Sequence, residues 1–402
     1  MTVGALTPCG LLQLRNFVTT SVCNSIEIVT EMATDVIVIG GGVIGLSIAR
    51  ELALDHTVSL IERGRCGQEA SSAAAGMLGA QAEAYGDDLF FRTCVESREM
   101  FPELAASLLD ETGIDVGLDL AGTLLLSFSE ADIAARSQRF AWQKAAGFEI
   151  EQLSAAEIRR EEPFISTDVL GGFYLPKDGQ IDNRKLVLAL QRSCELRGVK
   201  LVEETAVDGL AVENGKVNGV FAGKEKFAAD KVVLAAGAWG TEINAGFDLP
   251  FIIRPMRGQI LQFRTAKQLF KHVIVGPRGY IVPRSDGRVL SGATMDDAGF
   301  DASVTNEATA HLIESTAEIS PSLGALKVQD SWTGFRPFAP DRMPVFGRVP
   351  NAENLLLALG HFRNGILLSP VTAKLIANDL RGIAAVPTEF SPSRFYSAAM
   401  GS

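Results

Sequence analysis

Residues 35–62 constrain the fold most, because two apolar runs there flank a glycine-rich turn. The first run, "DVIVIG", is rich in β-branched residues, which is typical of a strand buried on both faces. Apolar residues then recur at helical spacing over residues 43–53, and "TVSLIE" predicts a second strand that ends on Glu62. This order of strand, helix and strand predicts a βαβ unit with a parallel sheet, and therefore an α/β fold.

The turn itself has the spacing Gly40-x-Gly42-x-x-Gly45. The first glycine permits a tight turn, the second lets the backbone approach a pyrophosphate, and the third lets helix and strand pack closely. Free N–H groups at the helix start then face the negative charge. Glu62 follows Gly42 by 20 residues, where a carboxylate can accept hydrogen bonds from ribose hydroxyls. The pattern predicts a dinucleotide site and disfavours NADP, but it leaves NAD and FAD open.

Local signals predict several further elements. Residues 182–198 read as a helix capped by Asp182 or Asn183. The pair Asn214-Gly215 predicts a hairpin turn inside an antiparallel meander. Additional helices are expected at 96–113 and 129–147, and a strand–turn–helix at 355–380.

A chain of 402 residues exceeds the usual size of one hydrophobic core, so two domains are expected. We predict a nucleotide-binding domain assembled from separated segments, with a second, substrate-binding domain inserted between them. The first comprises 33–90, 170–245 and 331–385, and the second comprises 91–169 and 246–330. Residues 386–402 form a C-terminal tail. We interpret residues 1–32 as a disordered or mis-called extension, with a cleaved targeting segment as the alternative.

Composition narrows the choice of partners and compartment. The formal net charge of −11 argues against a nucleic-acid partner, and no apolar run is long enough to predict a membrane span. The five cysteines are odd in number and widely spaced, which indicates reduced thiols without a disulfide framework or metal site. They are Cys9, Cys23, Cys66, Cys94 and Cys194. These features predict a cytoplasmic protein.

Five short segments resemble one known family. They are "EASSAAAGMLGA" (69–80), "VVLAAGAW", "GYIVPR", "SWTGFRPFAPD" and "GHFRNGILLSP". The chain is similar through them to the D-amino acid oxidase superfamily of FAD enzymes, and within it to glycine oxidases of the thiamine-biosynthesis type, over about residues 33–385. The resemblance implies a Rossmann-like FAD-binding domain of discontinuous segments and an inserted α+β substrate domain with an antiparallel sheet. It also implies homo-oligomers such as tetramers.

The same resemblance implies the residues that hold FAD. Val43 and Ile44 offer backbone contacts to the pyrophosphate, Glu62 and Arg63 lie on the adenosine side, and the backbone of Val207 meets the adenine. The ribityl chain and isoalloxazine are lined by Ser71, Ser72, Ala75, Gly76 and Met77. A helix start aimed at the N1–C2=O edge contributes His361, Asn364, Gly365, Ile366 and Leu367. Binding is expected to be non-covalent, since no cysteine follows Cys194 and the 69–77 segment contains no histidine.

Three residues are implied at the substrate. Arg336 matches the carboxylate-binding arginine, a role suited to its planar, two-pronged guanidinium, and Tyr280 matches a tyrosine that binds the same carboxylate. Arg363 is placed there by the resemblance alone, because the residues by themselves favour an arginine at a helix start that faces water. His361 reads as a packing residue, and no acid or base is required.

The implied reaction is oxidative deamination. Hydride transfer from glycine or another small amine or D-amino acid to flavin N5 yields an imine or 2-oxo acid and ammonia. Dioxygen then accepts the electrons to give hydrogen peroxide. The iminoglycine would supply thiamine thiazole synthesis. The alternative is a D-amino acid dehydrogenase that passes electrons to a quinone or another carrier.

Overall fold

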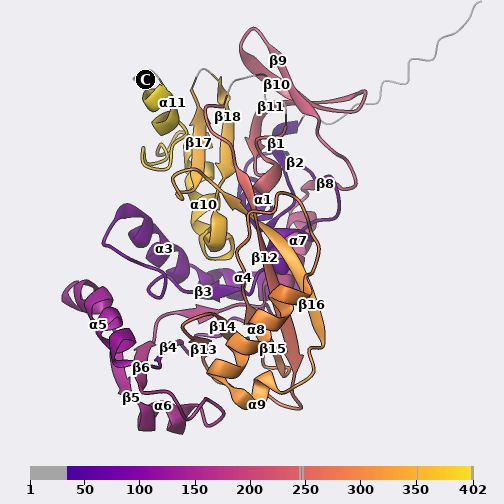
Figure 1. The fold of residues 1–402 in the computed structure, drawn as a ribbon. Helices are drawn as coiled ribbons and strands as arrows, with labels where there is room; N and C mark the ends of the chain where they lie inside the picture. Colours follow the sequence, from indigo (N-terminus) through magenta and orange to yellow (C-terminus); the bar gives the residue numbers. More distant parts are fainter. Residues whose placement is uncertain (1–33, 244–245, 247–248, 351, 400–402) are drawn as a thin grey trace, which may run out of the picture. The chain divides into compact units, whose positions relative to one another are not determined.

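The computed structural model describes residues 34–243, 246, 249–350 and 352–399. The extension predicted for residues 1–32, with Cys9 and Cys23, lies outside these described residues. Two large β-sheets and one two-stranded sheet account for the strands in the described part of the chain. Figure 1 shows helices α1, α7 and α10 beside the strands of the first large sheet and helices α8 and α9 beside those of the second.

The first large sheet is built around the N-terminal βαβ unit. Its strands run in the order β17-β18-β11-β1-β2-β8, with β9 and β10 attached beyond β11. The neighbouring pairs from β18 to β8 are parallel, and β17 is antiparallel at the edge. The strands span Thr34–Ile39 (β1), Val58–Ile61 (β2), Lys200–Val202 (β8), Gly209–Glu213 (β9), Lys216–Ala222 (β10), Glu225–Leu234 (β11), Val345–Val349 (β17) and Ala352–Leu359 (β18).

Strand β1 separates two cores, which confirms that it is buried on both faces. Val36 and Val38 pack with three helices, α1 (Val43–Leu52), α7 (Asn183–Leu196) and α10 (Gly365–Leu380). Ile37 and Ile39 point to the opposite face, against the β9–β11 meander and the C-terminal strands. Because successive strand residues alternate in direction, one apolar run supplies both cores.

Two local turn predictions are confirmed. Asn214 and Gly215 both have positive φ, at 53° and 76°, and they join β9 to β10 in an antiparallel hairpin. The Asp182 carboxylate accepts hydrogen bonds from the N–H groups of Arg184 and Lys185, so it caps α7 as expected.

The second large sheet runs β16-β12-β15-β14-β13-β4-β6-β5 and is antiparallel except between β13 and β4. The strands are Thr123–Ser127 (β4), Glu151–Ser154 (β5), Gly171–Leu175 (β6), Arg254–Arg264 (β12), Val273–Val275 (β13), Tyr280–Pro283 (β14), Arg288–Gly292 (β15) and Asp330–Phe338 (β16). Helices α8 (Asn306–Ile319) and α9 (Pro321–Gly324) bury Leu312 and Leu323 against it. β6, and β16 apart from Asp330, lie in this sheet although their residues fall within 170–245 and 331–385. The segment boundaries of the two domains stay a prediction.

One helix prediction is wrong in its bounds. Residues 96–113 do not form a single helix, because α3 (Leu89–Glu99) ends before Met100 and α4 (Phe101–Thr112) begins after it. Pro102 lies in the first turn of α4, where its missing N–H needs no partner, so it favours a new helix start there. The helix expected at 129–147 is confirmed as α5 (Glu130–Ala145), capped by Ser129.

The remaining elements are short. They are α2 (Ala70–Ala73), β3 (Met77–Leu78), α6 (Ala155–Glu161), β7 (Gly179–Gln180), the 3-10 turns η1 (Gly237–Trp239) and η2 (Phe362–Asn364), and α11 (Ser393–Ala399). Within the described ranges, none of the helices combines the length and apolar character that crossing a membrane requires.

Candidate active site

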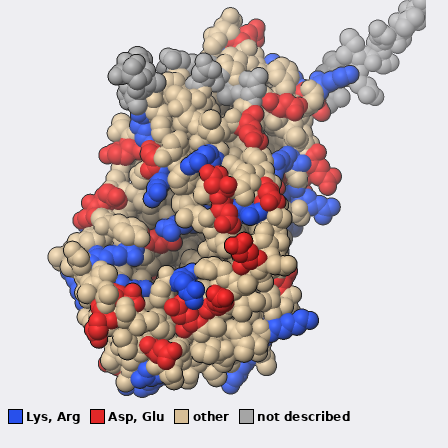
Figure 2. Space-filling model, viewed as in Figure 1, with Lys and Arg blue, Asp and Glu red and all other residues tan. Residues whose placement is uncertain are grey.

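A cavity of about 790 Å³ is lined by residues of both large sheets. The first sheet contributes the ends of β1 and β2, through Ile39 and Ile61, and the second contributes β12, β14 and β16. Figure 2 shows a hollow in the middle of one face, with acidic and basic side chains around it. The cavity extends from the glycine-rich turn to the start of α10, so it joins the two regions that the sequence singles out.

The glycine-rich turn has the geometry expected of a phosphate cradle. Gly40 has φ +104°, and a Cβ there would lie 2.6 Å from the carbonyl oxygen of Ala235. A Cβ on Gly45 would overlap the carbonyl oxygen of Gly40, so this glycine permits close helix–strand packing. Gly42 precedes α1 and lines the cavity, where the first N–H groups of the helix begin. One of these, the Val43 N–H, donates to Ser71 Oγ at 2.9 Å.

Acidic and aromatic side chains line the cavity beside this turn. The Glu62 carboxylate accepts hydrogen bonds from the N–H groups of Gly41 at 2.6 Å and Gly64 at 2.9 Å, which fixes its position. The Arg63 guanidinium lies 3.6 Å from the ring centre of Trp239 and pairs with Glu69 at 2.6 Å. Trp239 is a lining residue that sequence reasoning missed, although it belongs to the quoted "VVLAAGAW".

The structure brings most of the predicted cofactor residues to this one cavity. Those that line it are Gly40, Gly42, Val43, Ile44, Glu62, Arg63, Ser71, Ala75, Gly76, Met77, Val207, His361, Asn364, Gly365 and Ile366. Three predicted residues do not line it. Gly45 packs under the turn, the Ser72 carbonyl accepts a hydrogen bond from Asn183, and the Leu367 carbonyl accepts one from Ser97. A long cavity that begins at a glycine cradle and a helix N-terminus fits a dinucleotide such as FAD.

Helix α10 begins at the cavity. Asn364 precedes it and Gly365 is its first residue, so the unpaired N–H groups of the first turn lie near the lining residues Gly365 and Ile366. The partial positive charge of this helix end favours negative charge in the neighbouring space. Phe362, just before it, has a positive φ of 48°, which is unusual for an aromatic residue.

The His361 imidazole is held inside the protein. Nε2 lies 3.1 Å from Thr372 Oγ1, and the ring stacks on Phe346. Burial lowers the pKa of His361 to about 3, so the ring is neutral near pH 7. These contacts agree with a packing residue, and so low a pKa makes the imidazole a weak base.

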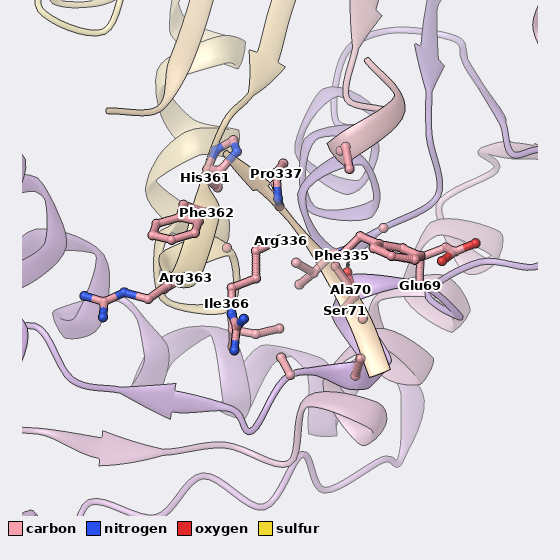
Figure 3. Close-up of a pocket in the computed structure, with 18 of the residues that line it drawn as sticks. Glu69, Ala70, Ser71, Phe335, Arg336, Pro337, His361, Phe362, Arg363 and Ile366 are labelled. Atoms are coloured by element: carbon pink, nitrogen blue, oxygen red, sulfur yellow. Dashed lines mark hydrogen bonds between the residues drawn. The ribbon is translucent and has the colours of Figure 1, made fainter. Parts of the chain in front are cut away.

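Arg336 is a half-buried cation that lines the cavity. It extends from β16, as Figure 3 shows, and Nη1 donates to the carbonyl oxygen of Thr294 at 3.0 Å. No carboxylate in the described part of the chain lies within ion-pair distance of it. Burial lowers the pKa of Arg336, which reflects the free energy of removing a guanidinium from water. An anionic ligand would compensate for that loss.

Tyr280 lies beside Arg336 at the start of β14. Its ring occupies space that Gly292 leaves open, since a Cβ on Gly292 would lie 2.6 Å from the phenol oxygen. Burial raises the pKa of Tyr280, so the phenol stays protonated and can donate a hydrogen bond. Arg336 and Tyr280 together present donors to one small part of the cavity.

Arg363 takes a different place from these two residues. Its side chain is 45% exposed, and Nη2 pairs with Glu83 Oε2 at 2.9 Å. In Figure 3 its guanidinium points away from that of Arg336. Glu83 also lines the cavity, and sequence reasoning missed it although it follows the quoted "EASSAAAGMLGA" by three residues. The charge of Arg363 is therefore partly neutralised at the cavity wall.

Comparison with known proteins defines the class. The family model described as FAD dependent oxidoreductase matches residues 35–378. The chain belongs to this family, and FAD is its cofactor.

Individual relatives show which members of the family the chain is similar to. The chain is similar to the bifunctional protein ThiO/ThiG of Synechocystis sp., at 36% identity over 91% of this chain and 54% of that protein. It is also similar to the glycine oxidase of Geobacillus kaustophilus, at 36% identity over 86% of this chain and 92% of the relative. The chain thus spans about half the length of the bifunctional relative. The crystal structure of glycine oxidase from Geobacillus kaustophilus matches with a TM-score of 0.86 and 33% identity, covering 90% of this chain and 99% of that one.

Proposed function

We propose that this chain catalyses the oxidative deamination of glycine or another small amine or D-amino acid, with dioxygen as the electron acceptor. The observation that carries the proposal is Arg336, a half-buried guanidinium that lines the cavity with no carboxylate partner in the described ranges. The similarity to proteins named glycine oxidase supports the choice of substrate.

The side chains account for substrate binding. Arg336 forms two parallel hydrogen bonds to the substrate carboxylate, and the Tyr280 phenol donates a third. Three donors fix the carboxylate and therefore the direction of the α-carbon, which converts a bimolecular encounter into an oriented one. Bound along the cavity from the Gly40–Gly45 turn to the start of α10, FAD would supply the hydride-accepting chemistry and the transfer of electrons to dioxygen.

No side chain acts as acid or base in this proposal. His361 contacts Thr372, and its pKa of about 3 makes it too weak a base to deprotonate an ammonium group, so in this proposal the substrate reacts with its amine already deprotonated. The N-terminus of α10 stabilises negative charge at the cavity, without reorganisation, because its N–H groups are fixed by the helix. Loss of the α-hydride gives an imine, which water hydrolyses to a 2-oxo acid and ammonia.

The cellular setting is part of the proposal. The imine of glycine would supply thiamine thiazole synthesis, as the name of the bifunctional ThiO/ThiG relatives suggests. We place the enzyme in the cytoplasm, as a homo-oligomer such as a tetramer, without a membrane or nucleic-acid partner. The described cysteines support a reducing compartment, since Cys66, Cys94 and Cys194 are all free thiols.

A substrate screen tests the proposal. The FAD-bound protein is mixed with glycine, sarcosine and D-alanine, and hydrogen peroxide is measured alongside ammonia or methylamine. We expect stoichiometric peroxide, and bleaching of the flavin by the same amines without oxygen. Bleaching with electrons delivered only to a quinone would identify a dehydrogenase. A flavin that no small amine bleaches would refute the proposal.

A further inference from the structure

One buried cation has no part in the function described above. Arg284 ends the quoted segment "GYIVPR" and directly follows β14, the strand that carries Tyr280 into the cavity. It is 5% exposed, and it does not line the cavity. Its surroundings connect it to the cofactor side of the site.

The Arg284 guanidinium binds neutral acceptors only. Nη2 donates to the carbonyl oxygen of Ala75 at 2.8 Å and to Asn183 Oδ1 at 3.2 Å, and Nη1 donates to Gln180 Oε1. No carboxylate within the described ranges forms an ion pair with it, and its Nε has no hydrogen-bond partner there. Burial lowers the pKa of Arg284 to about 10, so the group is charged near pH 7 but poorly compensated. Such an arrangement costs stability, which makes a packing role alone a poor explanation.

The acceptor at 2.8 Å belongs to the segment that faces the cofactor. Ala75, Gly76 and Met77 all line the cavity, and this short stretch has little regular structure of its own. Gly76 has φ +75°, and a Cβ there would overlap the Ile181 carbonyl oxygen. Gly76 therefore lets the backbone of this segment lie directly against Ile181, which no larger residue would permit.

Residues 180–183 supply the other partners. The Ile181 N–H donates to the Gly76 carbonyl at 2.8 Å, and Met77 pairs with Gln180 between β3 and β7. The Asn183 amide donates to the carbonyls of Ser71 at 2.8 Å and Ser72 at 3.1 Å. Arg284 binds both Gln180 and Asn183 as well as Ala75, so it joins the two segments at their centre.

We infer that Arg284 is a positioning residue for FAD: through the Ala75 carbonyl it fixes the cavity-facing backbone of residues 75–77 in the conformation that receives the cofactor. The inference depends on the cofactor and not on the substrate proposed above. β14 then serves both halves of the site, because Tyr280 at its start contacts the substrate region and Arg284 just past its end holds the cofactor segment.

The test measures FAD binding by the apo-protein and the thermal unfolding of that apo-protein. Arg284→Gln keeps one donor but loses the charge and the forked geometry, and we expect FAD affinity to fall roughly ten-fold or more, the scale of one lost charged hydrogen bond. Arg284→Lys retains a charged donor for the Ala75 carbonyl. Its affinity for FAD should therefore lie between those of the wild type and Arg284→Gln. Arg381→Gln is the matched control, because Arg381 is a partly buried cation that pairs with Glu51 and Asp55, each at 2.9 Å, and forms no ion pair or hydrogen bond with residues 71–77 or 180–183.

The outcomes separate positioning from simple stability. Arg381→Gln should lower the melting temperature of the apo-protein and leave FAD affinity unchanged. If Arg284→Gln behaves in the same way, with lower melting temperature and normal affinity, the inference is wrong. If Arg284→Gln yields no folded protein, Arg284→Lys decides the question: weaker FAD binding at a normal melting temperature supports the inference, and unchanged binding overturns it. Because no substrate is present, a failed substrate proposal cannot imitate either result.

Discussion

The Arg336 guanidinium occupies the space that a side chain on Gly258 would take. β12 and β16 are antiparallel neighbours, and a Cβ on Gly258 would lie 2.5 Å from Cζ of Arg336. A glycine on one strand thus creates the groove in which the arginine of the next strand lies. The position of the charge depends on two residues that are 78 apart in the sequence.

Replacing Gly258 by alanine should therefore displace the guanidinium without removing it. We expect KM for carboxylate substrates to rise roughly ten-fold or more, because a shift of about 1 Å in a positioning group is enough to disrupt two-point binding. FAD should remain bound. The control is Gly86→Ala, since nothing lies within 4 Å of a Cβ at that position. Equal KM values in the two variants would contradict the prediction.

Removing the guanidinium itself should have a larger effect. In Arg336→Ala the substrate carboxylate loses a half-buried charged partner, and we expect KM to rise by about two to three orders of magnitude. Arg336→Lys keeps a charge but binds at one point, so it should recover only part of the loss. Steady-state kinetics with glycine, together with the flavin absorbance of the purified variants, check both statements. An Arg336→Ala enzyme with normal KM would show that the carboxylate binds elsewhere.

Alanine substitutions at two glycines of the phosphate cradle should affect two different properties, FAD binding at Gly42 and protein stability at Gly45. A Cβ on Gly42 would meet only Ser71 Oγ, at 3.2 Å, and would point into the cavity, so Gly42→Ala should fold normally and bind FAD more weakly. A Cβ on Gly45 would overlap the Gly40 carbonyl, so Gly45→Ala should unfold at a lower temperature even without FAD. Apo-protein melting curves and FAD titrations of both variants provide the comparison. A Gly42→Ala protein with normal FAD affinity would argue against a cofactor at this turn.

Local patterns explain why the nucleotide half of the site was predictable. The turn from Gly40 to Gly45 lies within one βαβ unit, so its geometry follows from residues close in sequence. The hairpin at Asn214 and the cap at Asp182 are local in the same sense. The break at Met100 was missed although Pro102 signals it, because a proline six residues inside the predicted helix disfavours a continuous helix and suits the first turn of a new one.

The substrate half depends on contacts between distant residues. Glu83 and Arg363 pair across 280 positions of the chain, and no spacing rule connects an acid in "AQAEAYG" with an arginine before α10. Arg336 likewise has no distinguishing pattern around it, and only the family resemblance pointed to it. Tertiary packing of the two sheets brings these side chains to one cavity, so the sequence alone shows neither the ion pair nor the groove at Gly258.

The ion pair between Glu83 and Arg363 should influence which substrates are accepted. Glu83→Gln removes a negative charge from the cavity wall and leaves Arg363 free to bind a second carboxylate. We expect the ratio of kcat/KM for iminodiacetate to that for glycine to rise a few-fold, the scale of one partly exposed ion pair. Glu96→Gln is the control, because Glu96 forms a similar ion pair with Lys374 away from the cavity. An unchanged ratio in Glu83→Gln would show that this pair plays no part in selection.

The buried ring of His361 should make the protein sensitive to mild acid. The unfolded chain binds a proton on this residue below about pH 6.5, whereas in the folded protein the pKa is lowered to about 3 by burial. Between these values the unfolded state binds more protons, so the contribution of His361 to stability is complete above pH 6.5 and declines as the pH falls toward 3. From pH 6.5 to 5 the loss is about 2 kcal/mol, at roughly 1.4 kcal/mol for each pH unit.

Urea unfolding of wild type and His361→Gln at pH 6.5 and pH 5 measures this contribution. Glutamine does not titrate, and it can still hydrogen-bond Thr372, although it loses the stacking on Phe346 and should be less stable at both pH values. The informative quantity is therefore the change between the two pH values, which should be smaller in the variant by about 2 kcal/mol. The interval from pH 6.5 to 5 also avoids the titration of paired carboxylates such as Asp55. The pKa of Asp55 is lowered to about 2 in the folded protein and is 3.8 in the unfolded chain. The stability contributed by this carboxylate is therefore lost only below pH 5. If both proteins lose the same free energy between pH 6.5 and 5, His361 is not the residue that takes up the proton on unfolding, and its ring is accessible to water or charged in the folded state.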